Sequence, residues 1–235
     1  MSDVSPGITA NRYEQKFALT REGVDRLEAA VAGQLRLADH GHGPETRITT
    51  IYFDHADLDL FVAAVRAPRQ AVKVRLREYT TPACALTGRV LQMKFHEGVL
   101  TQKSRVAIEP EQVPDLLRGE DAARRVIARI AATQSPGRAA STARFLETDA
   151  FAVVCTNYRR LSYSGPDIRV TFDRDIEYHP VPTQGLPTLR ANLGIPTAVE
   201  ERAVMEIKMT SMARPAWLAR LLDAIEPEAF SKFVR

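Results

Sequence analysis

The sequence predicts an α+β fold built mainly from antiparallel strands, with helices at its periphery. Charged residues recur at every second position in several segments, which is the spacing of one face of a β-strand. The positions between them are mostly apolar or aromatic, so each strand has an apolar face and an ionic face. These segments are Arg12-x-Glu14-x-Lys16, Lys73-x-Arg75-x-Arg77, Gln92-x-Lys94, Tyr158-x-Arg160, Arg169-x-Thr171-x-Asp173 and Glu206-x-Lys208.

The remaining elements follow from apolar spacing and from turn residues. After the first ionic strand, Thr20 can cap a helix that we expect to continue to about Leu37. Glu97-Gly98 is typical of a hairpin turn between two antiparallel strands. Further strands are expected, in chain order, at residues 47–54, 71–79, 89–96, 100–108, 150–163, 168–178 and 203–210. Further helices are expected at residues 58–65, in an insert over 110–134 that resembles a lid, and at 215–225.

Composition is typical of a globular domain with a sizeable core. The chain has 235 residues, 45% of them hydrophobic and 26% charged, and no linker or repeat divides it, so we expect one domain over residues 1–235. Cys84 and Cys155 lack metal-site spacing and indicate reduced thiols. The pair His40 and His42 lacks a nearby third ligand, which disfavours a metal site there.

No apolar run is long enough to cross a bilayer, and we expect a cytoplasmic protein.

Positive charge is concentrated on the ionic strand faces. These faces carry nine basic residues and three acidic ones, a surplus of six, whereas the whole chain carries only +3. This distribution favours a polyanionic ligand. Nucleic acid is a secondary candidate, because the basic residues are neither clustered in tails nor interleaved with stacking aromatics.

Two architectures suit such strands. An open sheet would expose its ionic face to water, whereas a curled sheet would line a pore with it. Three observations favour the pore. Arginine, whose planar fork matches phosphate oxygens, is frequent on these faces. Glu14 and Glu206 each lie two residues before a lysine, which suits a divalent cation beside a phosphate. No glycine-rich phosphate loop is present in the sequence, so side chains would have to hold any phosphates.

Taken in order, the segments resemble the VTC domain, the polyphosphate polymerase branch of the triphosphate tunnel metalloenzymes. The resemblance spans nearly the whole chain and implies a closed eight-stranded antiparallel β-barrel that forms a triphosphate tunnel. It rests on Arg12-x-Glu14-x-Lys16-Phe17, Thr50-Ile51-Tyr52-Phe53-Asp54, Val74-Arg75-Leu76-Arg77-Glu78-Tyr79, Lys103-Ser104-Arg105, Arg169-Val170-Thr171-Phe172-Asp173, Glu206-Ile207-Lys208 and Phe230-Ser231-Lys232-Phe233.

The resemblance also implies an activity: transfer of the terminal phosphoryl group of ATP or another nucleoside triphosphate onto polyphosphate or pyrophosphate, with Mn²⁺ or Mg²⁺. Glu206 would be the main metal ligand, with Glu14 and Asp173 as further candidates. Residues expected to act in catalysis are Lys16, Arg75, Arg77, Lys94, Arg160, Arg169, Lys208 and Lys232. Residues expected to bind substrate are Arg12, Lys73, Lys103, Arg105, Tyr158 and Ser231. The sequence does not identify a membrane partner protein.

Two positions depart from the family pattern. Gln92 stands where the strand usually carries Glu, and Ala229 stands where a lysine often precedes the Phe-Ser-Lys-Phe segment. Both changes weaken the case for polymerase turnover more than the case for phosphate binding. A tunnel hydrolase of triphosphates and a noncatalytic polyphosphate or nucleotide sensor therefore remain alternatives to the polymerase.

Overall fold

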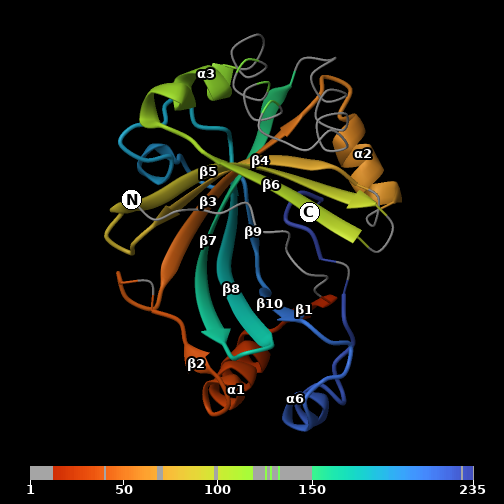
Figure 1. Cartoon of the computed structure of the whole chain (residues 1–235). Helices are drawn as coiled ribbons and strands as arrows, with labels where there is room; N and C mark the ends of the chain where they lie inside the picture. Colours follow the sequence, from red (N-terminus) through yellow and green to blue (C-terminus); the bar gives the residue numbers. More distant parts are fainter. Residues whose placement is uncertain are drawn as a thin grey trace.

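Eight strands form one continuous antiparallel path in the computed structural model (Figure 1). The structure describes residues 13–39, 41–67, 71–97, 100–118, 125, 128, 132, 150–228 and 230–234, with only the backbone for 95–97 and 100–104. The path runs through β1 (Tyr13–Leu19), β10 (Ala203–Met209), β8 (Ile168–His179), β7 (Phe151–Ser164), β3 (Thr46–Asp54), β4 (Lys73–Thr80), β5 (Leu86–Glu97) and β6 (Leu100–Ala107). Two short strands extend it: β2 (Arg36–Leu37) pairs with β7, and β9 (Ala198–Glu200) pairs with β8.

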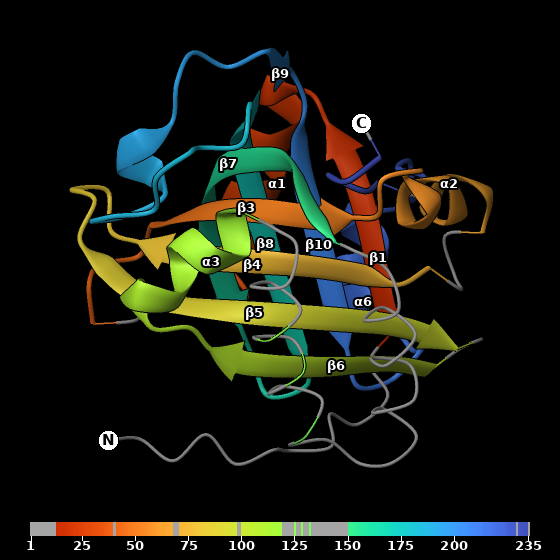
Figure 2. The ribbon, with the colours of Figure 1, turned by 90° about the horizontal axis from the view of Figure 1, so that it is seen from above.

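The sheet curls, but its closure into a barrel is not confirmed. Its two ends are β1 and β6, and no backbone pairing joins them within the described ranges. Figure 2 shows the strands from β4 to β6 crossing β10 and β1 at a steep angle, so the sheet folds over itself. The two halves meet through side chains, since Lys94 Nζ of β5 lies 3.9 Å from Glu14 Oε1 of β1. The predicted antiparallel sheet with peripheral helices is thus confirmed, in a curled form.

Alternation along the strands separates the two faces as expected. In β4, Val74 and Leu76 belong to an apolar core, while Lys73, Arg75 and Arg77 line the concave side. This core is completed by Val113 and Leu116 of α3 (Val113–Arg118). A second apolar core lies under α1 (Arg21–Ala32) and α6 (Ala216–Leu221). The outer face of the sheet is therefore covered, and its charged face turns inward.

Two helices, α1 and α6, are shorter than the sequence predicts. Thr20 caps α1 as expected, accepting a hydrogen bond from Gly23 N at 3.2 Å. The helix ends at Ala32 rather than near Leu37, because Gly33 weakens helix propagation and Leu37 pairs instead with Tyr163. At the other end of the chain, α6 ends at Leu221 instead of residue 225.

Other connections lie around the sheet. The expected short helix near residue 58 is α2 (Asp59–Arg66). The insert begins with the 3₁₀ turn η1 (Pro110–Gln112) and α3, and most of the predicted helical lid after residue 118 lies outside the described residues. A second 3₁₀ turn, η2 (Arg190–Asn192), was not predicted. None of the helices that the structure describes is both long and apolar enough to span a membrane.

Segment 230–234 packs against the concave side of the sheet. Phe230 joins a buried cluster with Ile48 and Tyr158. Phe233 stacks on Tyr52 with ring centroids 5.0 Å apart and meets Phe61 of α2 edge-on at 5.9 Å. These two aromatic anchors hold the intervening Ser231 and Lys232 in the cavity.

Candidate functional site

The concave side of the sheet encloses a cavity of about 380 Å³. Its lining comes from all eight strands of the path and from segment 230–234. Ten cationic side chains and two carboxylates line it. Such a concentration of one charge within low-dielectric walls attracts a strongly charged anion.

The structure brings most of the predicted site residues together here. Every residue expected to act in catalysis lines the cavity: Lys16, Arg75, Arg77, Lys94, Arg160, Arg169, Lys208 and Lys232. Among the expected substrate-binding residues, Lys73, Arg105, Tyr158 and Ser231 line it as well. Arg12 lies outside the described residues, and Lys103 is described only by its backbone, which pairs with Lys94. The roles assigned to these residues stay predictions.

Glu14 and Glu206 lie among three lysines, Lys16, Lys94 and Lys208. We call these five residues the lysine cluster. Glu14 lies 3.4 Å from Lys16, 3.9 Å from Lys94 and 3.5 Å from Lys208. Lys208 also forms an ion pair with Glu206. The cross-strand register creates this arrangement, because Glu14 lies opposite Lys208 and Lys16 lies opposite Glu206.

Two carboxylates that share one lysine fit a divalent cation. Mg²⁺ and similar ions are commonly held by one or two carboxylates, with phosphate oxygens and waters completing the shell. Glu14 and Glu206 are half-buried, line the cavity and both pair with Lys208. The donor set therefore agrees with the predicted Mn²⁺ or Mg²⁺ site.

Asp173, the third predicted metal ligand, is buried, is not one of the residues that line the cavity, and contacts two cations. Its Oδ1 accepts from Arg160 Nε at 2.6 Å, and its Oδ2 accepts from Arg160 Nη2 at 2.7 Å and from Lys232 Nζ at 2.5 Å. Burial by itself would raise the pKa of Asp173, but Arg160 and Lys232 outweigh it and hold the pKa well below its usual value. Its oxygens are engaged in holding two lining side chains, and its role as a metal ligand stays a prediction.

Arginines without a carboxylate partner occupy another part of the cavity. We call Arg75, Arg77 and Arg105 the arginine cluster. Across the described chain, no carboxylate lies within ion-pair distance of any of the three, and Arg77 Nε has no hydrogen-bond acceptor. Burial and the neighbouring Arg77 lower the pKa of Arg75.

Tyrosines surround the arginine cluster. Burial would raise the pKa of Tyr79, but Arg77, Arg75 and Arg105 outweigh it and lower that pKa. The pKa of Tyr52 is lowered in the same way, against burial, by Arg75 and Arg77. Lys232 also lowers the pKa of Tyr52, so three cations act on each of the two tyrosines.

Lys73 is a lysine of the cavity wall whose pKa is strongly lowered. Burial, then Lys16, Lys94 and Arg75, lower its pKa to about 7. Its Nζ donates a hydrogen bond to Ser231 Oγ at 2.9 Å. Lys73 therefore carries only part of a positive charge near neutral pH when no anion is bound.

The comparison with known protein families decides the classification. The sequence matches the VTC domain over residues 11–235. The chain belongs to the VTC domain family. This confirms the resemblance predicted from the sequence motifs, and it places the cavity described above inside a VTC domain.

Two solved structures are similar to this VTC domain at low sequence identity, and the first of them shares its fold. A protein from Hippeastrum, described as an adenylyl cyclase candidate with a dominant triphosphatase activity, is 14% identical with a TM-score of 0.52, over 94% of this chain and 92% of that one. A candidate adenylate cyclase from Bacillus halodurans is 14% identical with a TM-score of 0.49, over 86% and 83% of the two chains. No curated protein sequence was matched.

Several lining residues of the VTC domain were not named as site residues from the sequence. Tyr79 and Tyr52 lie in the cavity, as do Ser162, Thr171 and Phe230. The alternation could have indicated Tyr79, because it lies two residues after Arg77 on the same strand face. Phe230 depends on the path of segment 230–234, which strand periodicity does not predict.

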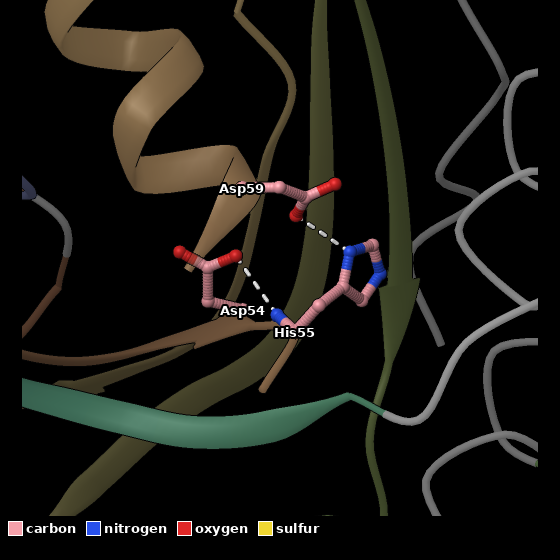
Figure 3. Close-up of side chains that lie close together, drawn as sticks. All are labelled: Asp54, His55 and Asp59. Carbon is pink, nitrogen blue, oxygen red and sulfur yellow. Dashed lines mark hydrogen bonds and ion pairs between the residues drawn. The ribbon is translucent and has the colours of Figure 1, made fainter. Parts of the chain in front are cut away.

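A separate acidic group lies where β3 ends and α2 begins. Asp54, His55 and Asp59 approach one another there, and none of them lines the cavity (Figure 3). Asp54 accepts from the backbone N–H groups of His55 and Leu60 through Oδ1 and of Phe61 through Oδ2, at 2.8 to 3.0 Å. The bonds from Leu60 and Phe61 satisfy two backbone N–H groups of the first turn of α2, so a structural role accounts for Asp54.

Proposed function

We propose that this VTC domain is an ATP-dependent polyphosphate polymerase, which transfers the terminal phosphoryl group of a nucleoside triphosphate onto a phosphate chain. The observation that carries the proposal is the cavity that ten cationic side chains and two carboxylates line. Phosphoryl transfer needs little covalent assistance from the protein and much positioned positive charge around the transferred oxygens. The cavity supplies that charge and a pair of carboxylates for a metal.

The residues act by binding and by orientation. Lys16, Lys94, Arg160 and Arg169 hold the phosphates of the triphosphate together with Arg75 and Arg77. Lys208 and Lys232 are positioned by carboxylates, the first by Glu14 and Glu206 and the second by Asp173. A divalent cation held by Glu206 and Glu14 supplies further charge neutralisation on the phosphate oxygens.

No strong general base is required for the polymerase reaction. The acceptor is a phosphate or phosphate chain, which is already ionised at neutral pH. The chain therefore has to align the acceptor with the terminal phosphorus and exclude water, since alignment provides much of the rate enhancement. We include the closed tunnel in this proposal, supported by the contact between Lys94 and Glu14 that joins two distant strands of the path.

Hydrolysis of triphosphates is the second candidate function. It is favoured by the shared fold with the Hippeastrum protein, for which a dominant triphosphatase activity is described. The two reactions differ in whether water or a phosphate attacks, which depends on the position of the acceptor.

Phosphorus NMR of the purified protein with ATP and Mn²⁺, with and without pyrophosphate, distinguishes the candidates. A polymerase produces internal phosphoanhydride signals that grow together with ADP. Free phosphate without such signals indicates a hydrolase. An unchanged ATP spectrum with broadened lines contradicts both enzymes and leaves a nucleotide-binding module.

A further inference from the structure

Lys73 and Ser231 form a hydrogen-bonded pair on the cavity wall. Lys73 belongs to β4 and Ser231 to segment 230–234, and both line the cavity. Lys73 Nζ lies 2.9 Å from Ser231 Oγ. When Lys73 is neutral, the serine hydroxyl can donate to Nζ along the same contact. A neutral lysine beside a serine is one of the pairs with which enzymes activate a serine nucleophile.

The surroundings of Lys73 favour its neutral form. Lys16 of β1, Lys94 of β5 and Arg75 of β4 act on it, and Glu14 of β1 opposes them. Burial and the three cations lower the pKa of Lys73 to about 7. Lys73 can therefore accept a proton near neutral pH, whereas an ordinary lysine, with a pKa of about 10.4, is fully protonated there.

Ser231 is held in place by short-range contacts. Phe233 N donates to Ser231 Oγ at 3.3 Å, and Val234 N donates to Ser231 O at 3.0 Å. Lys16 Nζ donates to the carbonyl of the preceding residue, Phe230, at 3.1 Å. The N–H group of Phe233 faces the oxygen that becomes negative when the hydroxyl loses its proton, so it would stabilise that charge.

We propose that Ser231 is a nucleophile that carries the transferred phosphoryl group as phosphoserine, and that Lys73 accepts the proton of its hydroxyl. This inference deepens the proposed function and rests on it. It divides the transfer into two displacements at one phosphorus, so the triphosphate and the acceptor chain react in succession.

Each displacement is balanced in bonds and protons. In the first, Ser231 Oγ bonds to the terminal phosphorus of the triphosphate, and the bond from that phosphorus to the bridging oxygen breaks. Its electron pair leaves with the nucleoside diphosphate, and the hydroxyl proton moves to Lys73 Nζ. In the second, a terminal oxygen of the acceptor chain attacks the same phosphorus. The Oγ–P bond then breaks, and Oγ recovers the proton from Lys73.

Exchange of label between ADP and ATP tests the intermediate without requiring it to accumulate. The protein is incubated with ATP, Mg²⁺ and radiolabelled ADP, without pyrophosphate or polyphosphate. A phosphoserine that returns its phosphoryl group to ADP carries the label into ATP. We expect exchange in the wild type and a loss of roughly a thousandfold or more in Ser231→Ala.

The configuration at phosphorus decides between one displacement and two, and excludes direct transfer onto ADP as the source of exchange. The donor is ATP whose terminal phosphorus is made chiral with sulfur and oxygen isotopes, and the acceptor is pyrophosphate. Each in-line displacement inverts the configuration, so two displacements retain it. We expect retention.

Lys73→Arg separates proton transfer from positive charge. Arginine keeps the charge but does not accept a proton at neutral pH, so this variant should bind tripolyphosphate and lose about a hundredfold in exchange rate. Bound phosphates favour protonated Lys73, so the wild-type exchange rate should rise between about pH 7 and pH 9. The rate of Lys73→Arg should lack this rise.

Ser211→Ala is the matched control for Ser231→Ala. Ser211 is exposed after β10 and is not one of the residues that line the cavity, so its removal should leave the exchange rate unchanged. Calorimetry with tripolyphosphate guards against a folding defect. Ser231→Ala should bind within about tenfold of the wild type, because it loses only neutral hydrogen-bonding capacity.

The outcomes separate this inference from the proposed function. Internal phosphoanhydride signals with inversion at phosphorus, or with full activity in Ser231→Ala, would overturn the phosphoserine and leave the polymerase standing. Exchange that depends on Ser231, with only free phosphate in the NMR experiment, would support the phosphoserine and contradict the polymerase. A protein that shows neither exchange nor phosphoryl transfer would overturn both.

Discussion

Lys232 Nζ lies 2.5 Å from Asp173 Oδ2, and the Asp173 side chain that it contacts is almost completely buried. The same carboxylate binds Arg160 through both oxygens. One acidic residue of β8 thus fixes two cations that come from β7 and from segment 230–234. The relationship connects the stability of the domain to the shape of its cavity.

Asp173→Asn should destabilise the domain by about 3 to 5 kcal/mol, because it leaves two cations without their counter-ion. Urea unfolding at pH 7 measures this loss. The low pKa of Asp173 means that its stabilisation is present above the carboxyl pKa of the unfolded chain and is lost as the pH falls toward the folded value. The unfolding free energy of Asp173→Asn should therefore fall less steeply on acidification than that of the wild type.

The control for this substitution is Asp175→Asn, which removes a carboxylate from an exposed ion pair with Arg159. Exposed pairs contribute about 1 kcal/mol or less, so this variant should be close to the wild type. Equal losses in the two variants would contradict the special role of Asp173. Added tripolyphosphate should stabilise Asp173→Asn more than the wild type, since it replaces the missing negative charge.

Arg77→Ala should weaken tripolyphosphate binding about 100-fold, or about 3 kcal/mol, because it removes a charged donor that no carboxylate holds. The free energy of unfolding should stay equal or rise, since one source of repulsion with Arg75 is removed. Calorimetry and urea unfolding measure the two quantities. A large loss of stability with unchanged binding would assign Arg77 a structural role.

Arg118→Ala is the matched control for Arg77→Ala. Arg118 is exposed on α3 and pairs only with Asp115 among the described residues. The Arg118→Ala variant should bind tripolyphosphate with the same affinity as the wild type. Equal weakening in both variants would indicate that net charge, rather than the cavity, determines affinity.

Lys73→Met should raise stability at pH 7 and remove part of its pH dependence. Since the folded pKa is about 7 and lies below the unfolded value, the folded chain binds fewer protons between pH 7 and about 10. Wild-type stability should therefore rise with pH through that window, and the rise should be smaller in Lys73→Met. Urea unfolding at pH 7 and 9.5 measures the difference, and equal slopes would contradict the assigned pKa.

The same substitution should change how binding depends on pH. A bound polyanion favours protonated Lys73, so the wild type should take up protons on binding tripolyphosphate near pH 8. Calorimetry in two buffers of different ionisation enthalpy measures this uptake. Lys73→Met should show less uptake and an affinity about tenfold lower, which is about 1.4 kcal/mol. Lys73→Arg keeps the positive charge, so it should bind tripolyphosphate tightly while taking up fewer protons than the wild type.

Phe233→Ala should destabilise the domain by about 3 kcal/mol and weaken tripolyphosphate binding. It removes the ring that stacks on Tyr52 and meets Phe61, so Lys232 and Ser231 lose their anchor. Phe233→Leu keeps an apolar side chain, so its stability and its affinity should lie between those of the wild type and Phe233→Ala. Normal binding by a destabilised Phe233→Ala would show that segment 230–234 positions no ligand contact.

Much of the sheet was predictable because strand alternation is a local property. The spacing of Lys73, Arg75 and Arg77 predicts that they share one face, and the cavity confirms that they do. The capping role of Thr20 was also predictable, since it depends on residues within one helical turn. The end of α1 was not, because Leu37 pairs with Tyr163, which is distant in the sequence.

By itself, the sequence determined which residues share a strand face, the positive charge of that face and the family. The tertiary structure decided which charges meet: Asp173 with Lys232, Gln92 with Arg75 and Glu14 with Lys94. It also decided that the sheet curls with β1 and β6 unpaired over the described ranges. The physical reason is that alternation depends on neighbours two residues apart. Ion pairing and closure depend on the register and twist of strands that are far apart in the chain.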